Sequence, residues 1–361
     1  MKNINLLFLT ILIISFSSMT ISIKSKERFI PVEEIRLAAQ NLSPYIYTHE
    51  DETYFPTSVE SMKINWTTDL YNTEATISYD YNTGKTLNNN APIYTNVQHL
   101  RTGEYLFSYA YMFAYNPCGP KLNVKAMVNF VVNPMNLNTN INVCPAGVHN
   151  GDIEHTQVLV DSSLNFISIT IGYHEWESIH TRNDIEWDGT HPIVYMAKGS
   201  HAMYSHPGDN QYLTLWKVDK TLKGKCPGIC KKLGIPYPCL KSCKYGISSS
   251  GILYDTVRKH NKFTGRVRIL ASNISSFEPF VVSPDEQNLL IYLGKFGEKI
   301  DNDGYYKFVK AVNLSLTGLY LVCSSCKSAI KGGLESDPAE FESNAPASLA
   351  TKKWWKNEDR I

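Results

Sequence analysis

The sequence lacks an excess of charge of either sign. Lysine and arginine together number 35 and aspartate and glutamate 34, so the formal net charge of the 361 residues is +1. A surface field of one sign, which nucleic-acid-binding proteins use to attract the phosphate backbone, is therefore missing. The composition argues against a nucleic-acid partner.

Long hydrophobic runs are missing once the first 23 residues are passed. The only such run, Leu6 to Phe16, follows Lys2 and precedes small polar residues. This order is typical of a secretory signal peptide, and we predict one over residues 1–22. A signal anchor is the alternative, but a membrane span needs roughly 20 mostly apolar residues. The stretch up to Ile23 is interrupted by four serines and two threonines.

A hydrophobic tail is absent from the C-terminus, where residues 354–360 include several charges. We therefore expect no C-terminal lipid-anchor signal. We expect a mature protein outside the cell or in a vacuolar or lysosomal lumen. Four glycosylation sequons agree with that route, and they begin at Asn41, Asn65, Asn273 and Asn313.

Cysteines are few but even in number, which suits disulfides in an oxidising compartment. The eight are Cys118, Cys144, Cys226, Cys230, Cys239, Cys243, Cys323 and Cys326. The four from Cys226 to Cys243 form two matching x3 pairs, and we expect them to bridge one another. A tetrahedral zinc site is the alternative, but thiols in this compartment oxidise.

Helical periodicity is scarce. Strand-like segments rich in Val, Ile, Thr and Tyr dominate, and they cover residues 75–81, 105–115, 125–132, 156–161, 165–173 and 193–197. We expect short helices only at Val32 to Asn41 and Ser248 to Lys259. The pattern predicts an all-β fold, a large antiparallel β-sandwich with short helices. Residues 23–361 would form one such domain, with a disulfide-stapled, Cys-rich basic insert at 217–247.

The insert stands out because Lys217 to Lys244 contains eight lysines and a single acid. Burial of so many charges is costly, so we expect a solvent-facing loop. An anionic membrane or a glycan surface is a candidate partner for it. A solvated face without a partner is the alternative.

Seven of the ten histidines fall between His149 and His206. In a strand, Asp152 and Glu154 would share one face and His155 would lie on the other. Two carboxylates on one face suit a divalent cation, an acid–base pair or a structural network. His149 in the preceding loop is a candidate third metal ligand beside these two carboxylates.

Two further predicted strands are followed by polar residues. His174 follows one predicted strand, and Gly199-Ser200-His201 forms a predicted tight turn after another. We expect these strand ends to converge with His149, Asp152 and Glu154 in one cluster. A serine nucleophile at Ser200 is disfavoured, because the Gly-x-Ser-x-Gly elbow is missing.

The chain resembles the vacuolar protein sorting-associated protein 62 family in three blocks. The first spans residues 38–60, with Pro44-Tyr-Ile-Tyr-Thr-His49-Glu-Asp-Glu52. The second is the aromatic segment Tyr105 to Asn116. The third is Gly151-Asp-Ile-Glu-His155, then His174, then His191 to Ala202 with His206-Pro-Gly208.

The resemblance covers about half of the chain. It implies an all-β domain associated with the vacuole or with vacuolar trafficking, and it implies no catalysis. Two features depart from the family: Ile153 stands where Trp is usual, and the basic cysteine segment has no counterpart.

A binding or structural protein is therefore the leading hypothesis, and an enzyme is not expected. The alternative is a metal-dependent hydrolase that uses Asp152, Glu154 and the histidines, which needs an open coordination position. The Asp-x-Glu-His text also resembles, by analogy only, the cation-binding heptapeptide of secreted necrosis-inducing cytolysins. A membrane-active secreted protein is thus a second alternative.

Overall fold

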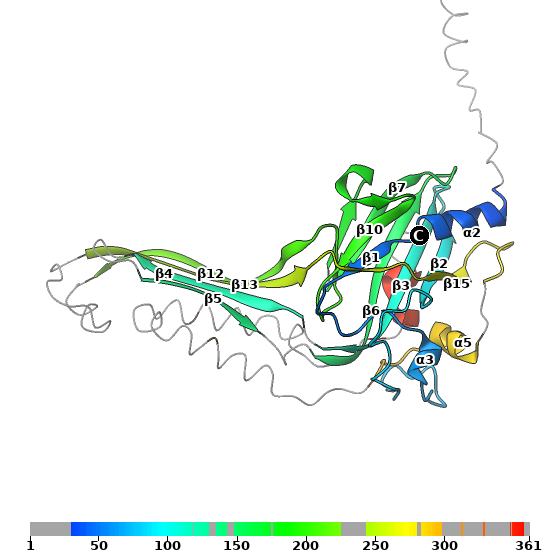
Figure 1. Cartoon of the computed structure of the whole chain (residues 1–361), viewed down its shortest axis with the longest axis horizontal. Coiled ribbons are helices and arrows are strands. Elements are labelled where there is room, and N and C mark those ends of the chain that lie inside the picture. The colour runs from blue at the N-terminus through cyan, green and yellow to red at the C-terminus, as the bar shows by residue number, and fades with distance from the viewer. Residues whose placement is uncertain are drawn as a thin grey trace, which may run out of the picture. The chain divides into compact units, whose positions relative to one another are not determined.

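The computed structural model describes residues 30–117, 119–129, 135–142, 148–174, 176–224, 243–279, 283–297 and 349–356, with positions 312, 328 and 347. The chain is mainly β-structure, which confirms the expected all-β class (Figure 1), while the sandwich arrangement and the disulfide-stapled insert stay predictions. The predicted signal peptide at 1–22 lies outside these residues. In the described ranges, no helix has the length and apolar character needed to cross a membrane.

The largest sheet has the strand order β15-β2-β3-β6-β7-β8. Its strands are β15 (Arg266–Ser272), β2 (Pro92–His99), β3 (Tyr105–Asn116), β6 (His149–Val160), β7 (Phe166–Tyr173) and β8 (Trp176–His180). The aromatic strand β3 lies between β2 and β6 and is buried at almost every position. β6 pairs with β3 from His149 onward, whereas its ladder with β7 starts only at Thr156. The first half of β6 therefore extends past β7, and the polar residues of the site lie on this extension.

A second sheet has the order β11-β10-β1-β14, with β9 paired to β10. Its strands are β1 (Tyr45–Thr48), β9 (Trp187–Asp188), β10 (His191–Met196), β11 (Met203–Tyr204) and β14 (Asn261–Phe263). The tight turn between β10 and β11 contains Ser200 and leads into His201. This sheet therefore positions the second group of site residues.

A third sheet has the order β12-β13-β4-β5, and Figure 1 shows these strands side by side as a long ribbon. They are β4 (Lys121–Asn129), β5 (Met135–Asn142), β12 (Gly208–Gly224) and β13 (Cys243–Val257). At one end of the ribbon, Val257 bridges Ala197 beside the turn before β11. This bridge brings Asp255 of β13 to the site.

Helices are short and few among the described residues. They are α2 (Val32–Asn41), α3 (Val59–Met62), η1 (Arg182–Asp184), α5 (Pro284–Ile291), η3 (Leu349–Thr351) and α9 (Lys353–Lys356). The predicted helix Val32 to Asn41 is confirmed: Glu33 and Glu34 occupy its first turn, where acids favour the helix dipole, and Ile35 and Ala39 are buried. α5 starts at a capping box of Ser283 and Glu286 with proline at its first position.

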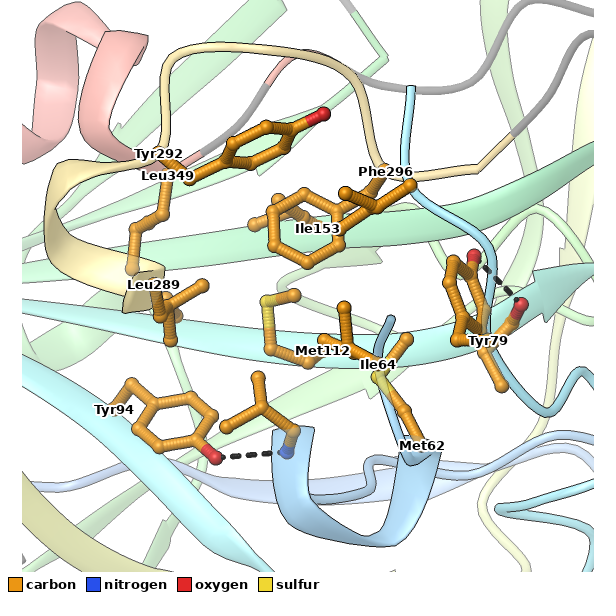
Figure 2. Packing of buried hydrophobic residues seen from close by; sticks show 14 of the residues in the cluster. Met62, Ile64, Tyr79, Tyr94, Met112, Ile153, Leu289, Tyr292, Phe296 and Leu349 are labelled. Atoms are coloured by element: carbon orange, nitrogen blue, oxygen red, sulfur yellow. Dashed lines mark hydrogen bonds between the residues drawn. The ribbon is translucent and has the colours of Figure 1, made fainter. Parts of the chain in front are cut away.

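A hydrophobic cluster lies directly behind the site. Ile153 of β6 and Met112 of β3 pack with Leu289 and Phe296 from the α5 region, as Figure 2 shows. Tyr94 and Tyr79 enter the same cluster: the Tyr94 hydroxyl accepts from the Val59 N–H at 3.0 Å, and the Tyr79 hydroxyl donates to the Ala114 carbonyl at 3.1 Å. Ile153 therefore anchors β6 from one face, while Asp152 points to the other.

The strand predictions at 105–115, 156–161, 165–173 and 193–197 are confirmed by β3, β6, β7 and β10. The expectation of purely antiparallel pairing is wrong in two places. β1 is parallel to β10 and β15 is parallel to β2. These partners lie more than a hundred residues apart in the chain, and distant strands are not constrained by hairpin geometry.

Two further local predictions are wrong. Ser248 to Lys259 is not a helix, because Ser248–Val257 belongs to β13 and is paired with β12 and β4. Three serines and a glycine make this segment a poor helix, and a Cβ at Gly251 would meet the Trp216 ring. Residues 75–81 form no strand but make isolated bridges at Thr76 and Ser78; Ile77 and Tyr79 are held by burial instead.

The predicted insert at 217–247 is only partly described. Lys217 to Gly224 continues β12 and pairs in register with Cys243 to Ser250 of β13, so both ends of the insert are strands rather than loop. The Lys217 side chain is exposed. Residues 225–242 and all eight cysteine side chains lie outside the described residues. Asn41, Asn65 and Asn273 are exposed, and Asn313 is also outside that set.

Candidate functional site

A pocket with a volume of about 430 Å³ opens beside the extended half of β6. Its walls come from the start of β6, the turn between β7 and β8, the turn after β10 and the C-terminal segment. Lining side chains include His149, Asp152, Glu154, His174 and Ser200. The structure thus brings together the polar strand ends that the sequence singled out.

The innermost part of the site is an ion-paired triplet centred on His201. Its Nδ1 lies 3.0 Å from Asp152 Oδ2, and its Nε2 lies 3.6 Å from Glu52 Oε1. His201 is fully buried and its ring stacks on Phe113 of β3 with centroids 4.0 Å apart. A buried imidazole between two buried carboxylates is stable only when it carries a positive charge.

The charges within this triplet stabilise one another. Burial opposes the charged form of His201, but the hydrogen bond to Asp152 and the charge of Glu52 outweigh it and raise the pKa of His201 to about 10. Burial likewise opposes the charged carboxylates, yet the contacts with His201 lower the pKa of both Asp152 and Glu52. All three groups are therefore ionised at neutral pH.

Both carboxylates are also satisfied by amide hydrogens. Glu52 accepts from the backbone N–H groups of Thr53, Tyr54 and Gly199 at 2.7 to 3.0 Å. Asp152 accepts from the backbone N–H of Ile153 at 2.9 Å and from the Asn116 amide at 3.2 Å. These bonds satisfy both carboxylates, whereas the buried His201 Nε2 faces Glu52 at 3.6 Å and makes no hydrogen bond among the described residues.

His149 joins this network through Asn116 rather than through a direct contact with Asp152. The Asn116 amide nitrogen is 3.1 Å from His149 Nε2, and His149 Nδ1 is 2.6 Å from the Gly151 carbonyl oxygen. Gly151 has φ of +66°, and a Cβ there would meet the Tyr79 hydroxyl and the Phe296 carbonyl. Only glycine fits at this position, which sets the direction in which β6 presents Asp152.

Glu154 differs from the other acids of the site. It is half-buried in the pocket wall, and among the described residues no hydrogen bond to its carboxyl group is found. Burial and the nearby negative charge of Asp152 raise the pKa of Glu154 to about 8. At neutral pH it is mostly the uncharged acid, which can both donate and accept a hydrogen bond.

A second polar centre lies on Asp255 of β13. Its carboxylate, which is fully buried, accepts hydrogen bonds from His174 Nε2 at 2.8 Å, Ser200 Oγ at 3.0 Å and Tyr204 Oη at 2.7 Å. Ser200 therefore donates to a carboxylate and not to a histidine. A serine nucleophile is activated by a histidine base, and no such contact of Ser200 is found among the described residues.

The C-terminal segment completes the pocket. Trp354 stacks on His155 with centroids 4.1 Å apart, and its backbone carbonyl accepts from Gln157 at 2.9 Å. The carbonyl of Trp355 accepts from Asn96 at 2.6 Å. Hydrogen bonds from sheet side chains thus hold the last described turn of the chain against the sheet. Lys352 and Trp354 of this segment line the pocket.

Two histidines of the site have a strained backbone. His174 has φ of +52° and His201 has φ of +57°. Such left-handed conformations cost about 1–3 kcal/mol each and persist only where the surroundings enforce them. Asp255 holds His174, and Asp152 with Glu52 holds His201, so the strain accompanies the polar contacts.

The predicted residues are thus divided among three contacts. Asp152 and His201 form the triplet, His174 and Ser200 share Asp255, and His155 lies on the opposite face of β6, 3.1 Å from Glu177. Sequence reasoning missed Asp255, Asn116 and the C-terminal tryptophan, and it quoted Glu52 only within a resemblance block. The alternation of apolar and polar residues in β13 around Asp255 could have indicated a strand there, but from the sequence alone we predict a helix for this segment.

The proposed metal ligands His149, Asp152 and Glu154 line one pocket, but they are not arranged as a ligand set. Within the described ranges, no three His, Cys, Asp or Glu side chains have the geometry to hold a metal ion. Asp152 already uses both oxygens for His201, Asn116 and Ile153. A divalent cation would have to displace these partners.

The shifted groups predict that the protein is more stable at pH 5.5 than at pH 8. A pKa of His201 raised from 6.5 to about 10 stabilises the fold fully below pH 6.5, and this stabilisation is lost as the pH rises toward 10. His201 alone should account for about 2 kcal/mol between these two pH values. The raised pKa of Glu154 acts in the same direction, because the unfolded chain ionises first. Urea unfolding at both pH values measures the difference; equal free energies would contradict the charged triplet.

Comparisons with protein-family models, curated proteins and solved structures give no match for this chain.

Proposed function

We propose that this protein is a binding protein of the secretory pathway, located outside the cell or in a vacuolar lumen, whose pocket takes a small ligand. The observation that carries the proposal is the combination of an open pocket with a buried, ion-paired polar network beneath it. The network holds the pocket wall in place, and the polar and aromatic side chains of the pocket can contact a ligand.

The polar groups of the network are already bonded to one another, and this favours binding over catalysis. A metal-dependent hydrolase needs an open coordination position and a carboxylate that activates water. Asp152 is occupied by three donors, and Ser200 is bonded to Asp255 rather than to a general base. Both groups are positioned as supports of the pocket wall.

The pocket has the properties of a small-molecule site. Its volume of about 430 Å³ lies within the roughly 300–1,000 Å³ that ligand pockets occupy. Aromatic and polar side chains both line it, and one lining residue, His174, is held in a strained conformation. Strain of this kind accumulates where a surface is preorganised for a ligand.

An acidic lumen suits the charge network. Both the positive charge on His201 and the uncharged state of Glu154 are favoured below neutral pH. The family resemblance at residues 38–60, 105–116 and 151–208 points to the same compartment. The membrane-active alternative depends on the lysine-rich segment 217–244, of which Lys217 is the described, exposed member; it stays a prediction.

A ligand screen tests the proposal. We would record thermal unfolding of the purified mature protein with methyl glycosides, choline, malonate and octanoate as representatives of four ligand classes. We expect at least one class to raise the unfolding temperature, because a ligand that binds the folded state stabilises it. Trp354→Ala should abolish the shift, and Trp187→Ala should keep it, since Trp187 stacks on Arg182 and does not line the pocket. A chain that responds to no class, or a shift that survives Trp354→Ala, would refute a pocket-binding function.

A further inference from the structure

The pocket has no charge preference that would select an ion. Glu177 contributes a negative charge and Lys352 a positive one, while Glu154 is mostly uncharged at neutral pH. A ligand of one strong charge would meet like charges in such a site. A neutral ligand with many hydroxyl groups avoids this repulsion and still uses every polar group.

The pocket also contains flat apolar surfaces. Trp354 has one ring face covered by His155 and is only partly buried, and Trp176 lines the wall beside the β7–β8 turn. Aromatic rings bind C–H-rich faces well, because their π-electron faces are negative and their area is large.

A polar group lines the same pocket as these aromatic surfaces. The Glu154 carboxyl group has no hydrogen-bond partner among the described residues, whereas the Asn116 amide is already bonded to Asp152 and His149. An uncharged carboxyl group combines a donor and an acceptor atom in one plane, so it can bind two neighbouring hydroxyl groups. A completely apolar ligand would leave Glu154 desolvated and unpaired, which is costly.

From this arrangement we infer that the pocket is a carbohydrate-binding site, which takes a neutral sugar ring with its C–H face on the tryptophans and its hydroxyl groups on Glu154. The inference rests on the proposed function, and it names the ligand class of that pocket. A ring sugar combines the two surfaces that the pocket offers, an apolar face and an edge of hydroxyl groups. Choline or malonate would use only one part of the site.

Titration calorimetry and saturation-transfer NMR with the methyl glycosides of glucose, mannose, galactose and N-acetylglucosamine test the inference. We expect at least one glycoside to bind the parent protein, with saturation transfer strongest at ring C–H protons. Trp354→Ala should weaken binding by about tenfold through loss of the ring. Glu154→Ala should weaken it by about fivefold to tenfold, whereas Glu154→Gln should retain most of the affinity because an amide still donates and accepts.

Matched controls separate binding from folding. Trp187→Ala should bind as the parent does, and circular dichroism with thermal unfolding should show that each variant is folded. Binding of choline or malonate without any glycoside would overturn the sugar assignment but leave the proposed binding function standing. Failure of all these probes would overturn both. Glycoside binding that Trp354→Ala and Glu154→Ala leave unchanged would place the sugar elsewhere and overturn the inference.

Discussion

Replacing His201 with glutamine should lower the free energy of unfolding by about 3–5 kcal/mol at pH 5.5, because two carboxylates then lose the positive charge between them. Asp152 and Glu52 are both buried, so neither can recover its solvation by turning outward. Glutamine keeps a Cβ at the left-handed position of residue 201, and the backbone strain is therefore similar in both proteins. Urea unfolding measures the change.

The effect of this substitution should depend on pH in a specific direction. The parent gains stability from the charge on His201 mainly below pH 6.5, so the difference between parent and variant should shrink by about 2 kcal/mol at pH 8. His206→Gln is the matched control, since His206 is exposed and its ring bonds only the neighbouring Ser205 among the described residues. It should change the free energy of unfolding by less than about 0.5 kcal/mol. An ordinary hydrogen bond contributes about 1 kcal/mol. If His201→Gln lowers the free energy of unfolding by less than this, or by the same amount at both pH values, the triplet is not held by ion pairs.

Trp355→Ala should lower the free energy of unfolding by about 3–5 kcal/mol, the usual cost of removing a buried tryptophan. Trp355 is 4% exposed and packs into the hydrophobic cluster behind Ile153. Its carbonyl is held by Asn96 and, at 3.4 Å, by Gln98. Because the cluster anchors β6 as well as the C-terminal turn, the loss should spread to the pocket and reduce ligand binding.

Tyr71→Ala provides the comparison for Trp355→Ala. Tyr71 is also a large aromatic residue, but 69% of its surface is exposed. Its removal should change the free energy of unfolding by less than about 0.5 kcal/mol. If both variants unfold at the same urea concentration as the parent, the C-terminal turn is not fastened to the sheet in the way described above.

Much of the local structure was predictable from the sequence. The helix at Val32 to Asn41 follows from its apolar spacing, and β3, β7 and β10 follow from runs of β-branched and aromatic residues. These signals are local, so a single sequence contains them. The histidine-rich window also indicated where the site lies, because strand ends at one edge tend to gather their polar residues.

The rest depends on contacts between distant segments. The parallel pairs of β1 with β10 and of β15 with β2 join strands without a hairpin between them, and no local pattern encodes such pairing. Asp255 was missed because its segment, rich in serine, gave ambiguous periodicity. Trp354 was missed because its role comes from hydrogen bonds that Gln157 and other sheet residues donate to backbone carbonyls. The pKa of Glu154 depends on burial, which only the folded chain defines.

The central claim is that the histidines and carboxylates beneath the binding pocket pair with one another and hold no metal ion. Metal analysis of the purified protein tests this claim most directly. The protein would be prepared without chelators, measured by inductively coupled plasma mass spectrometry, and compared with Asp152→Asn. The account predicts a substoichiometric content of every divalent metal in both proteins, and a thermal unfolding curve that a chelator leaves unchanged. The account would be contradicted by one equivalent of a divalent metal per chain that is lost in Asp152→Asn. The same holds if a chelator removes this metal and lowers the unfolding temperature.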